Sequence, residues 1–208
     1  MIKLEKDNFI KFSLSDFLNK IGEDAFKELV SDFSCPYDKD IEYFLTHKAV
    51  SFEKAEYQSS KTYLVGFVNS KQKFSLCGYY TLSNKPFILS EDLSKSKRKS
   101  LTGGKTNQDV ISAVLIGQLS KNYNNALNYT IDGSDLLAFA IETIFEVYNS
   151  VGLDLVYLEC KDEPKLKDFY SRNHFELYVN SKKEPIYTGK DSNLLCYIAK
   201  YKNIKIFE

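Results

Sequence analysis

The sequence predicts an α/β fold, and consecutive segments of its second half carry that prediction. The apolar run at residues 111–119 is typical of a buried strand. Residues 134–151 place apolar side chains, Phe145 among them, at inward helical positions. Residues 155–160 form a second apolar strand, and residues 164–172 form a short helix. A β-α-β-α unit of this kind binds a ligand where the first strand ends and its helix begins.

The first 56 residues predict a short β segment followed by helices. Residues 2–14 indicate one or two strands, and apolar residues recur at helical spacing through residues 15–33, with a bend at Gly22. Cys35 precedes a proline, which disfavours helix, so we expect a break there. A further helix restarts at residues 38–40 and runs to about residue 56.

A hairpin and a polar insertion separate these helices from the second half. Residues 62–68 and 74–82 are rich in β-branched and aromatic side chains, which favours a hairpin. Residues 90–109 contain a basic run, residues 95–99, and predict a surface helix or loop. Residues 103–106, Gly-Gly-Lys-Thr, resemble part of a P-loop. The position that needs the first glycine carries lysine, so we interpret the segment as a charged surface loop.

The composition bounds the class of protein. Lys plus Arg and Asp plus Glu number 28 each, so no long-range field of one sign is expected, which argues against a dedicated nucleic-acid binder. Four scattered cysteines and two histidines form no zinc pattern. The first seven residues lack the apolar core of a signal peptide, and no apolar run reaches membrane-spanning length. We therefore expect one domain over residues 1–208, in a cytoplasmic protein with reduced thiols.

An aromatic motif near the end of the chain carries a family resemblance. Residues 166–175, Leu-Lys-Asp-Phe-Tyr-Ser-Arg-Asn-His-Phe, match L-x-x-F-Y-x-x-x-G-F except that His174 replaces glycine. Together with the order of elements from residue 111, this motif resembles the Gcn5-related N-acetyltransferase (GNAT) superfamily. The resemblance implies a mixed, largely antiparallel central sheet flanked by helices, with a V-shaped splay between two parallel strands. It also implies acetyl-CoA as acyl donor and Tyr170 as the residue that protonates the departing thiolate.

The same resemblance places the cofactor-binding residues before and at the start of the helix at residue 134. Aligned back from two leucines, the family's pyrophosphate loop falls on Asn128, Ile131 and Gly133, of which only Gly133 keeps the family's residue type. A turn of this kind exposes free backbone N–H groups to phosphate oxygens. We expect the diphosphate of acetyl-CoA to bind at Asn128, Ile131, Asp132, Gly133, Ser134 and Asp135.

Two strand ends complete the predicted chemistry. Backbone N–H groups at Leu119, Ser120 and Lys121 could polarise the thioester carbonyl as an oxyanion hole does. A primary amine must lose a proton to attack the thioester directly. Glu159 is the candidate proton acceptor, with a water chain as the alternative acceptor, and it is equally compatible with a solvent-facing strand position.

The main interpretation is an acetyl-CoA-dependent N-acetyltransferase that acts on a small or macromolecular primary amine, and two alternatives stay open. Residues 32–35 and 41–45 resemble the F-x-C…L-x-x-F-L opening of GNAT toxins that acetylate charged tRNA, which would make tRNA the partner. The degenerate pyrophosphate loop leaves room for a non-catalytic interaction module. No membrane partner is expected, and homodimer formation is left open.

Overall fold

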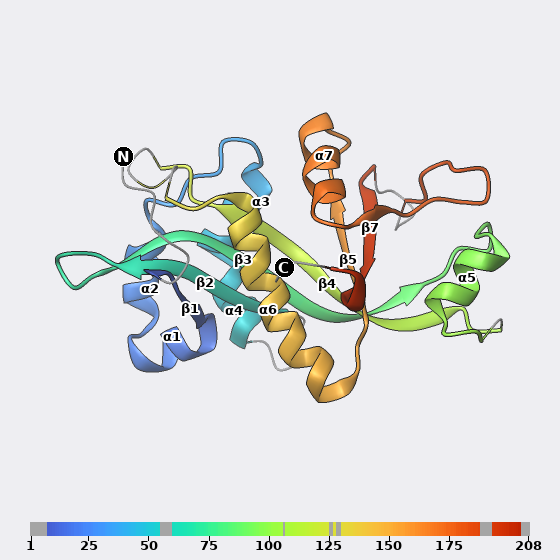
Figure 1. Ribbon diagram of the computed structural model, residues 1–208. Helices are drawn as coiled ribbons and strands as arrows, with labels where there is room; N and C mark the ends of the chain where they lie inside the picture. The colour runs from blue at the N-terminus through green and yellow to red at the C-terminus, as the bar shows by residue number, and fades with distance from the viewer. Residues whose placement is uncertain are drawn as a thin grey trace. The chain divides into compact units, whose positions relative to one another are not determined.

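The computed structural model describes residues 8–54, 60–105, 107–124, 127, 130–187 and 193–204. The chain forms two compact units: unit 1 comprises residues 1–83 and 117–142, and unit 2 comprises residues 84–116 and 143–208 (Figure 1). Three long elements run from one unit into the other, so neither unit is a continuous piece of chain. They are strands β3 (Phe74–Ile88) and β4 (Val110–Lys121) and helix α6 (Gly133–Val151).

Seven strands form a sheet in the order β1-β2-β3-β4-β5-β7-β6. The pairs β1/β2, β2/β3, β5/β7 and β6/β7 are antiparallel, whereas β4 and β5 are parallel. This arrangement confirms the predicted mixed, largely antiparallel sheet, and the β2/β3 pair is the predicted hairpin. The other strands are β1 (Ile10–Ser13), β2 (Lys61–Val68), β5 (Leu155–Cys160), β6 (Glu176–Leu177) and β7 (Leu195–Lys200).

The helices end at residues whose chemistry suits a helix end. Ser13 caps α1 by accepting a hydrogen bond from the backbone N–H of Asp16, and Gly22, with φ of 99°, separates α1 from α2. The predicted third helix is present, but a π-helical turn interrupts it. In the described part of the chain, no helix is both long and apolar enough to span a lipid bilayer. The bounds are α1 (Leu14–Lys20), α2 (Glu23–Val30), α3 (Lys39–Tyr43), η2 (Phe44–Lys48), α4 (Ala49–Lys54), α5 (Lys95–Leu101), α7 (Pro164–Arg172) and η3 (Tyr201–Asn203).

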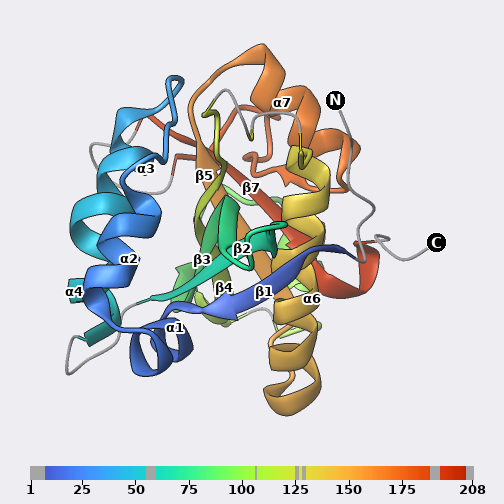
Figure 2. The same cartoon turned by 90° about the vertical axis from the view of Figure 1, so that its left-hand side faces the viewer.

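In unit 1, helices α1 to α4 lie on one side of β2 and β3, and the first half of α6 lies on the other (Figure 2). Leu64 and Tyr79 pack with Leu14 in the core on the first side. The next residue of β3, Tyr80, faces the second side, where its hydroxyl donates to the carbonyl of Phe139 at 3.1 Å. This alternation is the two-residue repeat of a strand buried on both faces.

A buried carboxylate ties the helices of unit 1 to β2. Glu53, in α4, is 4% exposed and accepts hydrogen bonds from the Ser15 hydroxyl and the Lys61 ammonium, both at 2.7 Å. The backbone N–H of Thr62 donates to its other oxygen at 3.3 Å. A charge can be buried here because several donors surround it.

In unit 2, a second core packs against β5 and β7 and contains Phe87, Tyr157 and Tyr178. The ring of Phe87 meets the rings of Tyr157 and Tyr178 edge-on, with centroids 4.9 and 5.1 Å away. The inward position predicted for Phe145 is wrong. Its side chain is 43% exposed, because α6 extends beyond the core. The ring of Phe145 stacks on the ring of Tyr201 in η3.

The parallel pairing of β4 with β5 is short. It runs from Ala113 opposite Leu155 to Ile116 opposite Leu158, while β4 continues to Lys121 and β5 to Cys160. The antiparallel pairing of β5 with β7, in contrast, extends over the whole of β5. A V-shaped splay requires that the pairing of two parallel strands stop before the strands end, and the pairing of β4 with β5 does so.

Candidate active site

The predicted acid, Tyr170, lies on α7, and both ends of that helix are well defined. Pro164 occupies the first turn, where its fixed φ and missing N–H suit a helix start. At the other end, the N–H of Phe175 donates to the Tyr170 carbonyl at 3.0 Å and that of His174 to the Ser171 carbonyl at 3.2 Å. This is a Schellman motif, and His174 has the left-handed φ of 64° that glycine usually supplies. The departure from the family motif therefore preserves the helix end at the cost of backbone strain.

The Tyr170 side chain is held by aromatic neighbours. It is 8% exposed, and its ring centroid lies 5.0 Å from that of Phe169, 6.1 Å from that of Phe175 and 5.7 Å from that of Tyr197. Burial raises the pKa of the phenol well above its usual range, and the nearby Cys160 raises it further. The phenol is therefore protonated at neutral pH, as a proton donor must be.

A buried tyrosine usually makes a hydrogen bond through its hydroxyl. The hydroxyls of Tyr79, Tyr80 and Tyr178 each hydrogen-bond to a backbone group. Among the described residues, no partner is recorded for the hydroxyls of Tyr170 and Tyr157.

Glu159, the predicted proton acceptor, lies on β5 but faces away from Tyr170. In the β5/β7 ladder it stands opposite Cys196, while the residue before it stands opposite Tyr197. Successive side chains of a strand point to opposite faces, so Glu159 shares a face with Cys196, and Tyr170 packs on the face of Tyr197. Burial raises the pKa of Glu159, and Lys85 opposes that rise. The structure does not bring the two predicted catalytic side chains together on one face of β5.

Two residues that sequence reasoning missed lie beside Tyr170. Tyr197 contacts its ring, and the nearby Cys160 contributes to the raised pKa of Tyr197. Burial raises the pKa of Cys160 to about 11, so this thiol is protonated rather than nucleophilic. Alternation along β5 and β7 could have grouped these side chains, but only if the pairing of those strands were known.

The start of α6, where the sequence predicts a phosphate-binding turn, lies in unit 1. Gly133 is its first residue, and the N–H of Leu136 donates to the Asp132 carbonyl at 3.1 Å. The carboxylate of Asp135 accepts from the backbone N–H of Asp132 at 3.2 Å, so it caps the helix. The N–H groups of the first turn, those of Gly133 and Ser134 included, have no partner within a helix and suit an anion. The two carboxylates nearby oppose that anion.

The remaining predicted binding residues differ in accessibility. Ile131 is 1% exposed, so it is closed to a ligand in this structure, and Asn128 lies outside the described residues. At the end of β4, Ser120 is buried and its hydroxyl donates to the Lys121 carbonyl at 2.9 Å, whereas Leu119 is half-buried.

The end of β4 is held firmly within unit 1. The side chain of Asn122 donates to the Leu76 carbonyl and accepts from the Ser34 backbone N–H, both at 3.1 Å. A Cβ atom on Gly78 would lie 2.9 Å from the Ser120 carbonyl oxygen, so only glycine permits this approach of β3 to β4. These contacts fix the backbone N–H groups that the sequence assigns to an oxyanion hole.

The predicted site residues that the structure describes thus fall into two groups, one in each unit. Unit 1 holds the end of β4 and the start of α6, and unit 2 holds Tyr170 and Glu159. Their meeting around one thioester stays a prediction. Among the described residues, no three His, Cys, Asp or Glu side chains are grouped as metal ligands.

No family model and no curated protein sequence matches this chain. Solved structures match it over almost its full length. AtaTR bound with acetyl-CoA is 23% identical, with 96% of this chain and 98% of that chain covered and a TM-score of 0.65. AtaT complexed with acetyl-methionyl-tRNAfMet is 20% identical over 95% and 98%, also at 0.65. A tyrosine-to-phenylalanine mutant of KacT is 20% identical over 95% and 98%, at 0.64. The chain therefore has the fold of these toxins, as the resemblance to the GNAT superfamily predicts.

Proposed function

We propose that this protein is an acetyl-CoA-dependent acetyltransferase toxin that acetylates the amino group of aminoacyl-tRNA. The fold match to toxins, one with acetyl-CoA and one with an acetylated aminoacyl-tRNA, favours this substrate over a small amine. The observation that carries the proposal is Tyr170, a buried and protonated phenol with no recorded partner among the described residues. We also propose that the two compact units together form one acetyltransferase domain.

The proposed reaction is a direct transfer. The neutral amine attacks the thioester carbonyl, a nitrogen–carbon bond forms and the carbon–sulfur bond breaks. Tyr170 donates its proton to the departing sulfur, and the amine loses one proton to an acceptor. Glu159 suits that second role through its raised pKa, but its position on the far face of β5 requires an intervening water.

The start of α6 is the proposed binding site for the diphosphate of acetyl-CoA. Its first-turn N–H groups supply donors, and the helix dipole favours negative charge there. Asp135 is engaged in capping, which reduces its opposition to the anion. The residues present therefore fit a diphosphate, held through the backbone rather than through charged side chains.

The test combines binding with turnover on two substrate classes. Titration calorimetry should detect acetyl-CoA binding, and mass spectrometry should detect an added acetyl group on aminoacyl-tRNA but not on free amino acids. Expression should arrest growth, and Tyr170→Phe should relieve the arrest. Binding without any transfer would support the non-catalytic module instead. Transfer to free amines alone would support a small-molecule acetyltransferase.

A further inference from the structure

The described residues of the segment between β3 and β4 form an arm that hydrogen bonds hold in place. Arg98 fastens it at both ends, donating to the Ser90 carbonyl at 2.8 Å and to the Asp109 carboxylate at 2.7 Å. The N–H of Gly104 donates to the Lys99 carbonyl at 2.9 Å, which folds the following turn back onto α5. Figure 1 shows α5 at the end of the β3–β4 extension of unit 2. We call residues 90–109 the basic arm.

The cations of the basic arm divide into two groups. Arg98 holds the arm together, and Lys97 forms an ion pair with Glu176 of β6. Lys95, Lys99 and Lys105 are exposed, and no ion pair joins any of them to another described residue. Three positive charges are therefore presented to solvent from a fixed backbone.

The charge of Lys95 does not stabilise α5, whereas Lys99 lies in the last turn, where a cation suits the helix dipole. Lys95 stands in the first turn, which holds no acidic residue, so its charge opposes the helix dipole. Lys95 and Lys99 are also four residues apart on the same face, where like charges repel. A helix of seven residues has little intrinsic stability to spare. The stability of α5 therefore gives no reason for a lysine at position 95, whereas contact with a negatively charged partner would.

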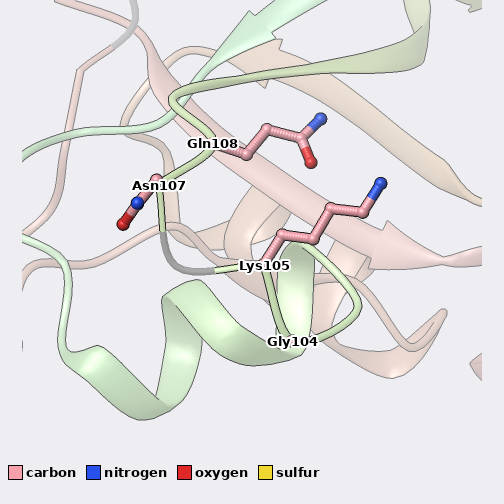
Figure 3. A pocket seen from close by; sticks show the side chains of 4 residues that line it. All are labelled: Gly104, Lys105, Asn107 and Gln108. Atoms are coloured by element: carbon pink, nitrogen blue, oxygen red, sulfur yellow. The ribbon is translucent and has the colours of Figure 1, made fainter.

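A shallow, open hollow lies beside α5. Gly104, Lys105, Asn107 and Gln108 line it, and Figure 3 shows the Lys105 ammonium and the Gln108 amide extending to the same side. Positive φ angles at Gly103 and Gly104, 63° and 95°, form the turn that presents Lys105. The Gln108 amide nitrogen already donates to the Val110 carbonyl at 2.9 Å, so the Lys105 ammonium is the group that suits a phosphodiester oxygen here.

The basic arm is also fixed to the body that carries Tyr170. The ammonium of Lys200, in β7, donates to the Ser100 carbonyl, and the N–H of Ser181 donates to the Asp92 carbonyl at 2.9 Å. Tyr170 packs on β7 in the same unit. A partner bound to the arm is therefore held in a constant relation to the proposed acid.

We propose that Lys95, Lys99 and Lys105 bind the sugar-phosphate backbone of tRNA, at a distance from its aminoacyl end. This inference takes its substrate, tRNA, from the proposed function. A tRNA extends far beyond the aminoacyl group that reacts, so it can also contact residues at a distance from that group. A membrane surface fits less well, since α5 buries no side chain and its only apolar residue is Leu101. The contacts are to phosphate, so they position the RNA without reading its sequence.

The experiment compares two triple variants of the full chain. The test variant is Lys95→Gln/Lys99→Gln/Lys105→Gln. The control is Lys20→Gln/Lys71→Gln/Lys73→Gln, which removes the same charge from exposed lysines of unit 1. Fluorescence anisotropy with deacylated tRNA, without acetyl-CoA, is measured over a range of salt concentrations, so that binding does not depend on chemistry. Matching circular dichroism spectra and melting temperatures establish that both variants fold.

The test variant should bind tRNA at least about tenfold more weakly at 0.1 M salt, and its salt dependence should flatten by roughly two to three units of slope. The control should stay within about threefold of wild type. Equal binding by the test variant and wild type, or an equal loss in the control, would overturn the proposal. Lysine-dependent recruitment to anionic vesicles without tRNA binding would overturn it in favour of a membrane.

Failure of the proposed function has a different signature. In that case the wild-type protein transfers no acetyl group to aminoacyl-tRNA, whatever the basic arm binds. If the arm proposal alone fails, transfer occurs and KM for aminoacyl-tRNA is the same in the test variant and wild type. If both hold, the test variant has a raised KM and an unchanged turnover of bound substrate.

Discussion

Three tyrosine-to-phenylalanine changes in unit 2 should separate catalysis from stability. Tyr170 and Tyr157 are buried, and neither hydroxyl has a recorded hydrogen-bond partner within the described ranges. Tyr178 accepts a hydrogen bond from the backbone N–H of Ser90 at 2.9 Å. Each substitution removes one oxygen atom and leaves the ring in place, so the three variants differ only in what that oxygen does.

The expected magnitudes follow from these contacts. Tyr178→Phe leaves a backbone N–H without its partner and should lower the free energy of unfolding by about 1–2 kcal/mol. Tyr170→Phe and Tyr157→Phe should stay within about 0.5 kcal/mol of wild type. A general acid contributes about 10²–10⁴-fold, so Tyr170→Phe alone should lower turnover by that factor. This corresponds to about 3–5 kcal/mol of activation free energy.

Urea unfolding and single-turnover acetyl transfer to aminoacyl-tRNA are the two assays. Tyr157→Phe is the matched control, because it removes a similar hydroxyl from the same unit. If Tyr170→Phe turns over at the wild-type rate, the phenol is not the acid. If it unfolds more easily by as much as Tyr178→Phe, the hydroxyl has a structural partner and the argument from its unpaired state fails.

Three further changes test the packing around the site. Glu53→Ala removes the carboxylate that binds Lys61 and should lower the free energy of unfolding in urea by about 2–4 kcal/mol. The surface control Glu23→Ala should lower it much less, because water screens that ion pair, and equal losses would contradict the assigned burial. His174→Gly should raise the free energy of unfolding by about 1 kcal/mol by relieving the left-handed backbone, and a decrease would show that the imidazole makes stabilising contacts. Burial raises the pKa of Glu159 above 4.5, so its ionised form costs stability once the pH passes that value. Glu159→Gln should therefore raise the melting temperature at pH 8 and leave it unchanged near pH 4. An equal increase in melting temperature at both pH values would refute this explanation.

Local signals in the sequence predicted the elements around the site well. Residues 155–160 and 164–172 are β5 and α7 as predicted, because a short apolar run ends there and Pro164 starts a helix. Gly22 and Asp38 mark the helix ends that their chemistry indicates. Such signals depend only on residues close in sequence, which is why they can be recognised without the tertiary structure.

The orientation of the site residues could not be predicted, because it depends on the pairing of strands that are far apart in the sequence. The face that Glu159 presents depends on its register with Cys196, a residue 37 positions later along the chain, and only the β5/β7 ladder determines that register. The same ladder brings Tyr197 against Tyr170. The strained His174 appears in the sequence as a departure from a motif, but its left-handed backbone becomes evident only with the Schellman hydrogen bonds.

The net charge of the chain also does not predict which cations are available for binding. Equal numbers of acidic and basic residues argue against a general attraction for nucleic acid. Binding, however, depends on which cations remain available after folding. In the basic arm, Arg98 and Lys97 are engaged in holding the segment, while Lys95, Lys99 and Lys105 share one ordered scaffold and are exposed. Fixed charges at short range act within a Debye length, where the net charge of the whole chain matters little. A neutral protein can therefore contact tRNA phosphates through a local surface, provided that those three ammonium groups carry the salt dependence of binding.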